Sequence, residues 1–375
     1  MGIDLNDIGE LKKVLNIKEI NPKTKFWMVR TKKGFFYKEF ISEEFIALGW
    51  NFITSEKIKN INDEDDLEIL RNELKKLFPK IKNTTQIINK CIRFSEEIRE
   101  GDIIMIPSNK KENEIAFAIA GKYYEEKECT HEKEIEAIDR IDSGLDYGIE
   151  VKCPYKKRRK IELLKVVDGN SLNVNLYKVL ASYHGISDIS SYGDFILSSI
   201  YNAYCWNNKL NMVFSVEQKT DIGAIPLSSF IYNSSKLFSL VEKDIQVTTK
   251  ANLNSPGDLI LSIQQYGSSI LQLLQSKMFL LTIISLWFGV CGGKIGPVEF
   301  KSFAELIMKA REHKLKIRSD KLDIEKKEFE LIKSKIEVAE KYIGEIKIAA
   351  DSLEINTDAA TKIINISDYL SEKGD

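Results

Sequence analysis

The most constraining feature of the chain is a run of fourteen residues without a charge, MFLLTIISLWFGVC at 278–291. As a helix this run would be about 21 Å long, whereas the hydrocarbon core of a bilayer is about 30 Å thick. Its apolar side chains would point in every direction, so other apolar groups must surround it. Three placements remain open: a helix buried in a protein core, a short membrane helix flanked by Lys277 and Lys294, or a re-entrant or oligomer-buried segment.

The composition limits the class of protein. The 375 residues carry 55 Lys and Arg against 56 Asp and Glu, a formal net charge of −1, which excludes a chain that is basic throughout. A mean hydropathy of −0.22 excludes a polytopic membrane protein but allows one short apolar segment. The start has no basic stretch followed by an apolar one, so we expect a cytoplasmic protein. It is either free or attached to the inner membrane, with membrane lipid as a partner through residues 270–291.

Cysteine and histidine are too few and too scattered to predict a zinc site. The five cysteines include no CxxC pair, and the chain has three histidines. Structural zinc sites need clustered Cys and His ligands, so we expect no metal and no cofactor.

Residues 301–350 predict a long, highly charged helix with an apolar seam. One set of apolar residues recurs every seven positions: Met308, Leu315, Leu322, Phe329, Ile336 and Ile343. In the later part, three more complete an a/d seam: Ile332, Ala339 and Ile346. A second stripe lies on another face: Ile317, Ile324, Leu331 and Val338. Two apolar stripes need two neighbouring helices, which favours a homo-oligomer or a bundle, with packing inside one chain as the alternative.

The first third of the chain predicts a small α+β unit. Strands are expected at residues 26–30, 34–37, 101–107 and 114–121. Residues 63–80 predict a helix, because the stretch begins with acidic residues and continues with leucines at helical spacing. A second helix is expected around residues 84–97.

Aromatic and glycine residues in this unit follow an order that resembles a known family. The likeness is carried by Trp27, Arg30, Phe35, Phe36, Tyr37, Phe40, residues 47–50 (ALGW), Phe94, Gly101, Asp102, residues 119–121 (IAG) and Tyr123. This pattern resembles the PUA-like, EVE-related domain at the N-terminus of many prokaryotic restriction and defence proteins. The resemblance covers residues 25–124, about a third of the chain.

The resemblance implies a β-barrel with a concave, aromatic-lined pocket that holds a base or nucleotide. The residues it places at the ligand are Trp27, Arg30, Trp50 and Phe94. An aromatic ring can stack on the flat face of a base, an interaction worth about 1–3 kcal/mol. The alternative is that Trp27, Trp50 and Phe94 are core aromatics of the barrel, since the sequence does not show which rings face a pocket.

Residues 126–165 are expected to form a polar connector that ends in a basic run. The run is Lys156, Lys157, Arg158, Arg159 and Lys160, and it predicts either a phosphate-contacting patch or a solvated face. Before it, Glu150 and Lys152 resemble half of a restriction-type nuclease site, with Asp142 or Asp146 as a further carboxylate for magnesium. Those acids are close in sequence rather than on separate strands, so the metal-dependent nuclease is the alternative function.

In the rest of the chain the sequence predicts secondary structure and domains but no catalytic motif. Residues 166–265 indicate a second α+β domain, with strands at 211–216 and 245–249. Residues 266–300 hold the apolar helix and a glycine-rich break, and residues 301–375 hold the charged heptad helix. No GxSxG, P-loop, HExxH or GxGxxG motif occurs.

Together these features predict an α+β fold. We expect an N-terminal PUA-like β-barrel domain over residues 1–125, a second α+β domain, and a C-terminal long helix preceded by the short core or membrane helix. The expected function is a non-enzymatic sensor-effector of antiphage defence. Its PUA-like domain would recognise a nucleic acid or nucleotide, and its C-terminal half would form a homo-oligomer and engage the membrane through residues 270–291. A structural oligomeric adaptor is a further alternative.

Overall fold

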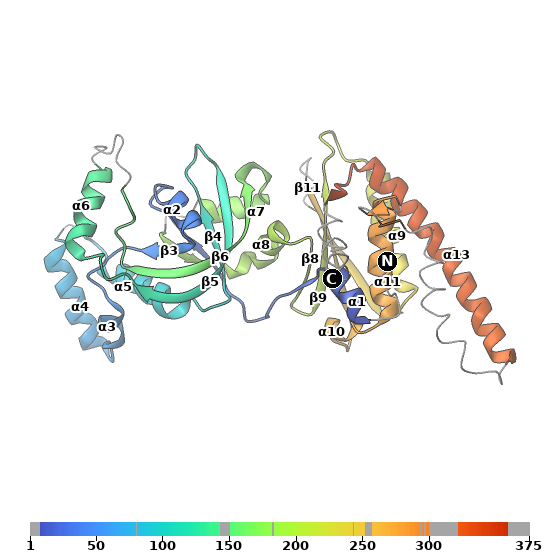
Figure 1. Cartoon of the computed structure of the whole chain (residues 1–375), viewed down its shortest axis with the longest axis horizontal. Helices are drawn as coiled ribbons and strands as arrows, with labels where there is room; N and C mark the ends of the chain where they lie inside the picture. The colour runs from blue at the N-terminus through green and yellow to red at the C-terminus, as the bar shows by residue number, and fades with distance from the viewer. Residues whose placement is uncertain are drawn as a thin grey trace, which may run out of the picture. The chain divides into compact units, whose positions relative to one another are not determined.

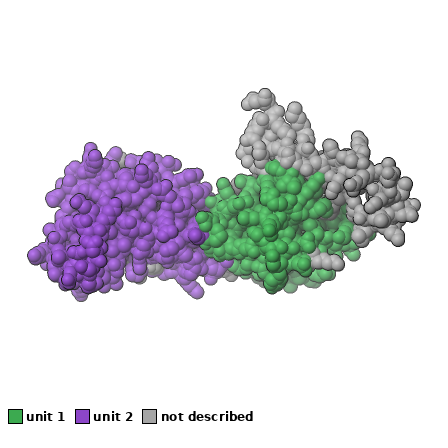
Figure 2. Space-filling model, turned by 90° about the horizontal axis from the view of Figure 1, so that it is seen from below, with its two compact units in different colours: residues 1–22, 201–375 green, residues 23–200 purple. Residues whose placement is uncertain are grey.

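The computed structural model describes most of the chain between residues 8 and 358. The described ranges are 8–79, 81–142, 151–181, 184–242, 244–251, 257–292, 294–295, 298–299 and 322–358. The chain divides into two compact units (Figure 2), one of residues 23–200 and one of residues 1–22 with 201–375. We call them the inserted unit and the terminal unit, because the first lies in the sequence between the two parts of the second.

The inserted unit is built on a curled, mixed six-stranded sheet (Figure 1). Its strands are β2 (Phe26–Val29), β3 (Phe45–Leu48), β4 (Ile103–Pro107), β5 (Glu114–Glu125), β6 (Lys157–Asp168) and β7 (Ile186–Asp188). They lie in the order β3-β6-β5-β4-β2-β7. Strands β2 and β4 run parallel, and every other neighbouring pair is antiparallel.

This sheet corrects two predictions from the sequence. Among the described residues no ladder joins the edge strands β3 and β7, so the expected β-barrel is an open sheet. The expected polar connector at 126–165 contains most of β6, which pairs with both β3 and β5. Strand β7 extends the same sheet beyond β2. The unit therefore runs to residue 200 rather than ending near 125, because main-chain pairing joins segments that differ in composition.

Helices surround the inserted sheet. They are α2 (Tyr37–Ser42), α3 (Ser55–Lys59), α4 (Glu64–Leu77), α5 (Thr84–Ile92), α6 (His131–Asp142), α7 (Val174–Leu180) and α8 (Gly193–Ile200), with a π-helical turn (Arg93–Glu97) after α5. The helix expected at 63–80 is confirmed as α4, whose N-cap Asp63 accepts the N–H of Asp66. The strand expected at 34–37 is wrong, because Lys32, Lys33 and Gly34 all have positive φ and turn the chain into α2.

The terminal unit combines residues 1–22 with residues from 201 onward. Its five-stranded sheet has the order β1-β8-β9-β11-β10, namely β1 (Lys18–Glu19), β8 (Ala203–Trp206), β9 (Lys209–Val216), β11 (Gly257–Gln265) and β10 (Ile245–Ala251). A small hairpin is formed by β12 (Lys294–Ile295) and β13 (Val298–Glu299). The helices are α1 (Ile8–Val14), α9 (Ala224–Ser239), α10 (Ile270–Leu273), α11 (Lys277–Val290) and α13 (Leu322–Ser352).

The fourteen-residue apolar run forms α11, and the terminal unit buries it. Every side chain from Phe279 to Val290 is buried, and α11 packs against α1, α9 and α13. Trp287 stacks on Phe214 of β9 with ring centroids 4.5 Å apart. The core-helix placement of α11 is therefore confirmed and its prediction as a membrane helix is wrong, because protein covers its apolar surface. Membrane lipid as a partner through residues 270–291 stays a prediction.

Across the part of the chain that the structure describes, no helix is both long and apolar enough to cross a bilayer.

Helix α13 uses its predicted seam inside the chain. Ile336, Ala339 and Ile346 are buried, and the helix packs along α9 and α11 (Figure 1). The approach to α11 is close at Gly289, where a Cβ would lie 3.0 Å from Ile343 Cγ2. Val338 of the second stripe is 40% exposed, while the earlier seam residues Met308 and Leu315 lie outside the described residues. The homo-oligomer stays a prediction.

Replacing Leu286 by Ala should test the core position of α11. The side chain is fully buried, so its truncation should lower the free energy of unfolding by about 2–5 kcal/mol. The matched control is Met278→Ala on the same helix, where the side chain is 39% exposed and the loss should stay below about 1 kcal/mol. Urea unfolding followed by circular dichroism measures both, and equal small losses would contradict the buried placement.

Candidate functional site

A cavity of about 620 Å³ opens on the inserted unit beside Trp50. Three aromatic side chains line it, Trp50, Phe78 and Tyr155. Three cationic residues line it as well: Arg30, Lys32 and Lys33. Helix α6 contributes Glu134, Ile135, Ile138 and Asp139. We call this the Trp50 cavity, and it combines flat apolar rings with positive charge.

Trp50 sits on a strained turn that follows β3. Its φ of 65° is in the left-handed region, which a bulky residue adopts only when the surroundings enforce it. The two oxygens of the Glu134 carboxylate accept the N–H of Trp50 at 2.5 Å and the N–H of Asn51 at 2.6 Å. Gly49 allows this close approach, because a Cβ there would lie 2.6 Å from Glu134 Oε1.

The same turn is also held through its carbonyl groups. The buried ammonium of Lys157, on β6, donates to the carbonyl of Trp50 at 2.7 Å and to that of Ile53 at 2.9 Å. The position of the Trp50 backbone is thus fixed from both sides, by a carboxylate on its N–H and an ammonium on its carbonyl.

Asn51 connects the turn to its surroundings. Its Nδ2 donates to the carbonyls of Thr130 at 2.9 Å and Pro154 at 2.8 Å, and its Oδ1 accepts the N–H of Lys156 at 2.7 Å. Thr130 directly precedes α6, so one buried amide joins the turn, the start of α6 and the segment leading into β6.

Aromatic rings brace Trp50 from α4 and α6. The Trp50 and Phe78 rings meet edge to face with centroids 5.3 Å apart, and Phe78 meets His131 in the same way at 5.2 Å. The Trp50 side chain remains partly exposed and lines the cavity. A braced, partly exposed indole is suited to stacking on a flat ligand.

The cationic side of the cavity lies on the turn before α2. Lys32 and Lys33 have φ of 50° and 56°. Lys32 forms an ion pair of 3.1 Å with Asp142 at the end of α6, and Lys33 is exposed. The Arg30 guanidinium donates to the carbonyl of Leu180. Positive charge therefore stands beside the aromatic wall, as an anionic ligand would require.

Burial shifts the proton affinities of the groups that hold the turn. It raises the pKa of Glu134, although the two N–H groups and Lys157 oppose the rise. It lowers the pKa of Lys157 and raises that of Tyr155. These shifts show that ionisable groups are buried at the Trp50 turn beside a cavity, an arrangement that is common at functional sites.

The structure divides the four predicted ligand residues into two pairs. Arg30 and Trp50 both line the cavity. Trp27 and Phe94 are fully buried, so their prediction as ligand residues is wrong and the core-aromatic alternative holds. The indole N–H of Trp27 is used inside the fold, where it donates to Asp102 Oδ2 at 2.9 Å.

The sequence reasoning missed Lys32, Lys33, Phe78, Tyr155 and Glu134. Lys32 and Lys33 offered one signal, since they follow Arg30 within the segment that the resemblance covers. Glu134 offered none, because one acid in a polar stretch, EEKECTHEKEIEAIDR, resembles its exposed neighbours.

Residues 157–160 of the basic run belong to β6, which corrects the phosphate-binding prediction for Lys157 and Arg159. For Lys156, Arg158 and Lys160 it stays a prediction. Successive side chains of a strand point to opposite faces. Lys157 and Arg159 consequently point inward and are buried. Arg159 donates to the carbonyls of Phe94, Ser95, Ile98 and Gly121. Lys160 is exposed, whereas the Lys156 ammonium lies 3.9 Å from the carboxylate of Glu125.

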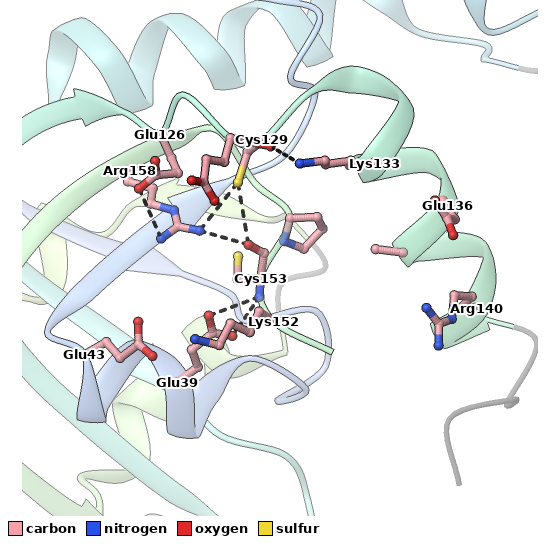
Figure 3. A pocket seen from close by; sticks show the side chains of 13 residues that line it. Glu39, Glu43, Glu126, Cys129, Lys133, Glu136, Arg140, Lys152, Cys153 and Arg158 are labelled. Carbon is pink, nitrogen blue, oxygen red and sulfur yellow. Dashed lines mark hydrogen bonds and ion pairs between the residues drawn. The ribbon is translucent and has the colours of Figure 1, made fainter. Parts of the chain in front are cut away.

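A second hollow of about 400 Å³ lies against the opposite face of α6 (Figure 3). Arg158 lines it and donates to the carbonyl of Cys153 at 2.9 Å. Both oxygens of Glu39 accept the N–H of Cys153, at 2.8 and 3.1 Å. These charged groups bind main-chain atoms and one another, so the hollow is a polar junction between α2, α6 and β6.

The residues of the nuclease alternative are not brought together where they are described. Lys152 lines the second hollow, whereas Asp142 pairs with Lys32 beside the Trp50 cavity. Asp146 and Glu150 lie outside the described residues. Among the residues that are described, no group of three or more His, Cys, Asp or Glu is placed to hold a metal ion.

No protein-family model, no curated protein and no solved structure matches the chain. The function must therefore be inferred from the geometry of the Trp50 cavity and from the resemblance of residues 25–124 to the PUA-like domain.

Replacing Arg159 by Met should separate a structural arginine from a phosphate-binding one. The variant leaves buried carbonyls without their donor, so the free energy of unfolding should fall by about 2–4 kcal/mol. Lys160→Met, one residue away and exposed, should change it by less than about 0.5 kcal/mol. Chemical unfolding of both variants is the measurement, and comparable stabilities would contradict the buried role.

Proposed function

We propose that the inserted unit recognises a nucleobase, carried by a free nucleotide or by a single strand of nucleic acid, in the Trp50 cavity. The observation that carries the proposal is the Trp50 turn. Its left-handed residue is held by Glu134 and Lys157, and its indole lines a cavity of about 620 Å³. Cavities of about 300–1,000 Å³ are typical of small-ligand sites.

The aromatic groups support a planar ligand. Trp50 and Tyr155 line the cavity with Phe78 behind the indole, and base–aromatic stacking is worth about 1–3 kcal/mol per base. Stacking accepts every base, because each has a π face. Selection among bases would then fall to the polar groups at the same cavity, chiefly Asp139 of α6 and the main chain next to Trp50.

The cationic groups support a ligand that carries phosphate. Arg30, Lys32 and Lys33 line the same cavity, so a stacked base would bring its phosphate near positive charge. Binding of phosphate by cationic side chains releases the counterions condensed on a nucleic acid, and this gain falls as the salt concentration rises. We therefore favour a nucleotide or oligonucleotide over an uncharged nucleoside.

The biological role that we propose for the whole chain is based on the resemblance of its first third to the PUA-like domain of prokaryotic defence proteins. We propose that the chain is a non-enzymatic antiphage sensor, with self-association of the terminal unit as its output. Val338 and Ile348 of α13 stay exposed on the terminal unit, which supports a contact with a second copy. Analytical ultracentrifugation with and without ligand tests this part, and a monomer under both conditions would contradict it.

Replacing Trp50 by Ala should weaken binding of a base by about 5- to 150-fold, the equivalent of losing one stacking contact. The probes are the four ribonucleoside monophosphates, the four deoxyribonucleoside monophosphates, and fluorescent single-stranded DNA and RNA decamers. Calorimetry and fluorescence anisotropy measure the affinities. Trp50→Phe keeps a smaller π face and should recover part of the loss.

The matched control is Phe35→Ala. Phe35 is an aromatic residue of the same unit that is 44% exposed and does not line the cavity, so affinity should stay unchanged. Unaltered binding by folded Trp50→Ala, or failure of the wild type to bind any probe, would contradict the proposed function.

A further inference from the structure

Helix α6 is attached to the inserted unit in an unusual way. It has twelve residues, and the one whose side chain is buried is Glu134. A surface helix ordinarily docks through an apolar stripe. Of the four apolar side chains of α6, Ile135 and Ile138 line the Trp50 cavity, where Ile135 is 40% exposed, whereas Ala137 lines the second hollow and Ile141 packs, partly buried, against the core. The helix therefore forms one wall of the cavity while a carboxylate provides its buried contact.

That carboxylate is bonded to the opposite wall. Its two oxygens accept successive main-chain N–H groups, of Trp50 and Asn51, at 2.5 and 2.6 Å. Hydrogen bonds to an ionised acceptor are about twice as strong as those between neutral groups. Lys157 holds the carbonyl of the same Trp50, so the turn is fixed between a carboxylate on α6 and an ammonium on β6.

We propose that Glu134 is a positioning residue of the Trp50 cavity, which holds the Trp50 turn and α6 at the separation that lets both walls contact a base. The inference rests on the proposed function, because it assigns a role within the same site. Glu134 acts through Trp50 and α6 rather than by touching the base. If its two hydrogen bonds were lost, the strained Trp50 turn would no longer be held and α6 would lose its buried contact at the same time.

The ionised form of Glu134 is the one that holds the turn, since a neutral carboxyl group is a weaker acceptor. Four titratable groups face it from the elements around it: Lys157 on β6, His131 on α6, Cys91 on α5, and Tyr155 before β6. Burial raises the pKa of Glu134, so it takes up a proton at a higher pH than a surface carboxyl does. Base affinity should thus be full above this raised pKa and fall as the pH drops through it.

The first experiment needs no ligand. The full chain is labelled with 5-fluorotryptophan, which gives one ¹⁹F signal for each of its four tryptophans, and Trp50→Phe assigns the Trp50 signal. Between about pH 8 and about pH 5, the Trp50 signal should shift with a single apparent pKa in the wild type and not in Glu134→Gln. His131→Asn is the control for the neighbouring imidazole and should keep the shift.

The signals of the core tryptophans Trp27 and Trp287 show whether each variant is folded. A Trp50 signal that titrates equally in Glu134→Gln and wild type, or in neither, would overturn the positioning role. If Glu134→Gln does not fold, wild type and His131→Asn decide the matter: a Trp50 signal that does not titrate in wild type, or that no longer titrates in His131→Asn, would overturn the positioning role.

The second experiment uses the decamers and monophosphates described above as probes. Glu134→Gln should bind about tenfold more weakly at neutral pH, the cost of one lost hydrogen bond. Its affinity for the decamers, whose phosphodiesters do not titrate between about pH 5 and about pH 8, should no longer vary with pH. Glu136→Gln is the matched control, because Glu136 lies on the opposite face of α6 at the second hollow. Equal pH profiles for wild type and Glu134→Gln would overturn the inference. If no probe binds, the proposed function fails, and the fluorine titration alone decides whether Glu134 positions Trp50.

Discussion

Two buried charges organise the inserted unit around one turn. The ammonium of Lys157 and the carboxylate of Glu134 bind the carbonyl and the N–H of Trp50 from opposite sides. Removing each ion from water costs several kcal/mol, so a fold retains such groups only where hydrogen bonds compensate them. Here those bonds go to the main chain rather than from one charge to the other. The edge of the sheet, the attachment of α6 and the shape of the cavity all depend on them.

Sequence patterns predicted the parts of the fold that periodicity determines. The leucine spacing of α4 and the seam of α13 placed those helices correctly, because burial of apolar side chains decides both. The basic run of β6 was misread, because a run of like charges indicates solvent while a strand sends every second residue inward. Lys157 and Arg159 are tolerated there because they donate to carbonyls that lie 38 to 107 positions away in the sequence, and no local pattern reveals such partners.

The domain boundaries failed for a related reason. The terminal unit takes α1 and β1 from the start of the chain and the remainder from beyond residue 200. The predicted boundaries followed changes in composition along the sequence. A compact unit is instead defined by the segments that pack against one another, which can lie far apart in the sequence. The apolar run of α11 illustrates this, because its cover comes from α1, α9 and α13. Judged alone it resembles a membrane helix, and only its partners show that the chain itself supplies the apolar surroundings.

The contrast between Trp27 and Trp50 shows what separates a core ring from one that lines a cavity. Both fit the family pattern equally, so residue type does not distinguish them. Trp27 lies in a relaxed strand, and its N–H joins those of Lys25 and Arg99 in satisfying the buried carboxylate of Asp102. Trp50 has a left-handed backbone, which costs of order 1–3 kcal/mol. Stability alone would favour glycine at that position. The tryptophan held there by two buried charges packs on Phe78 and at the same time lines the cavity, which is why we propose it as the residue that contacts a ligand.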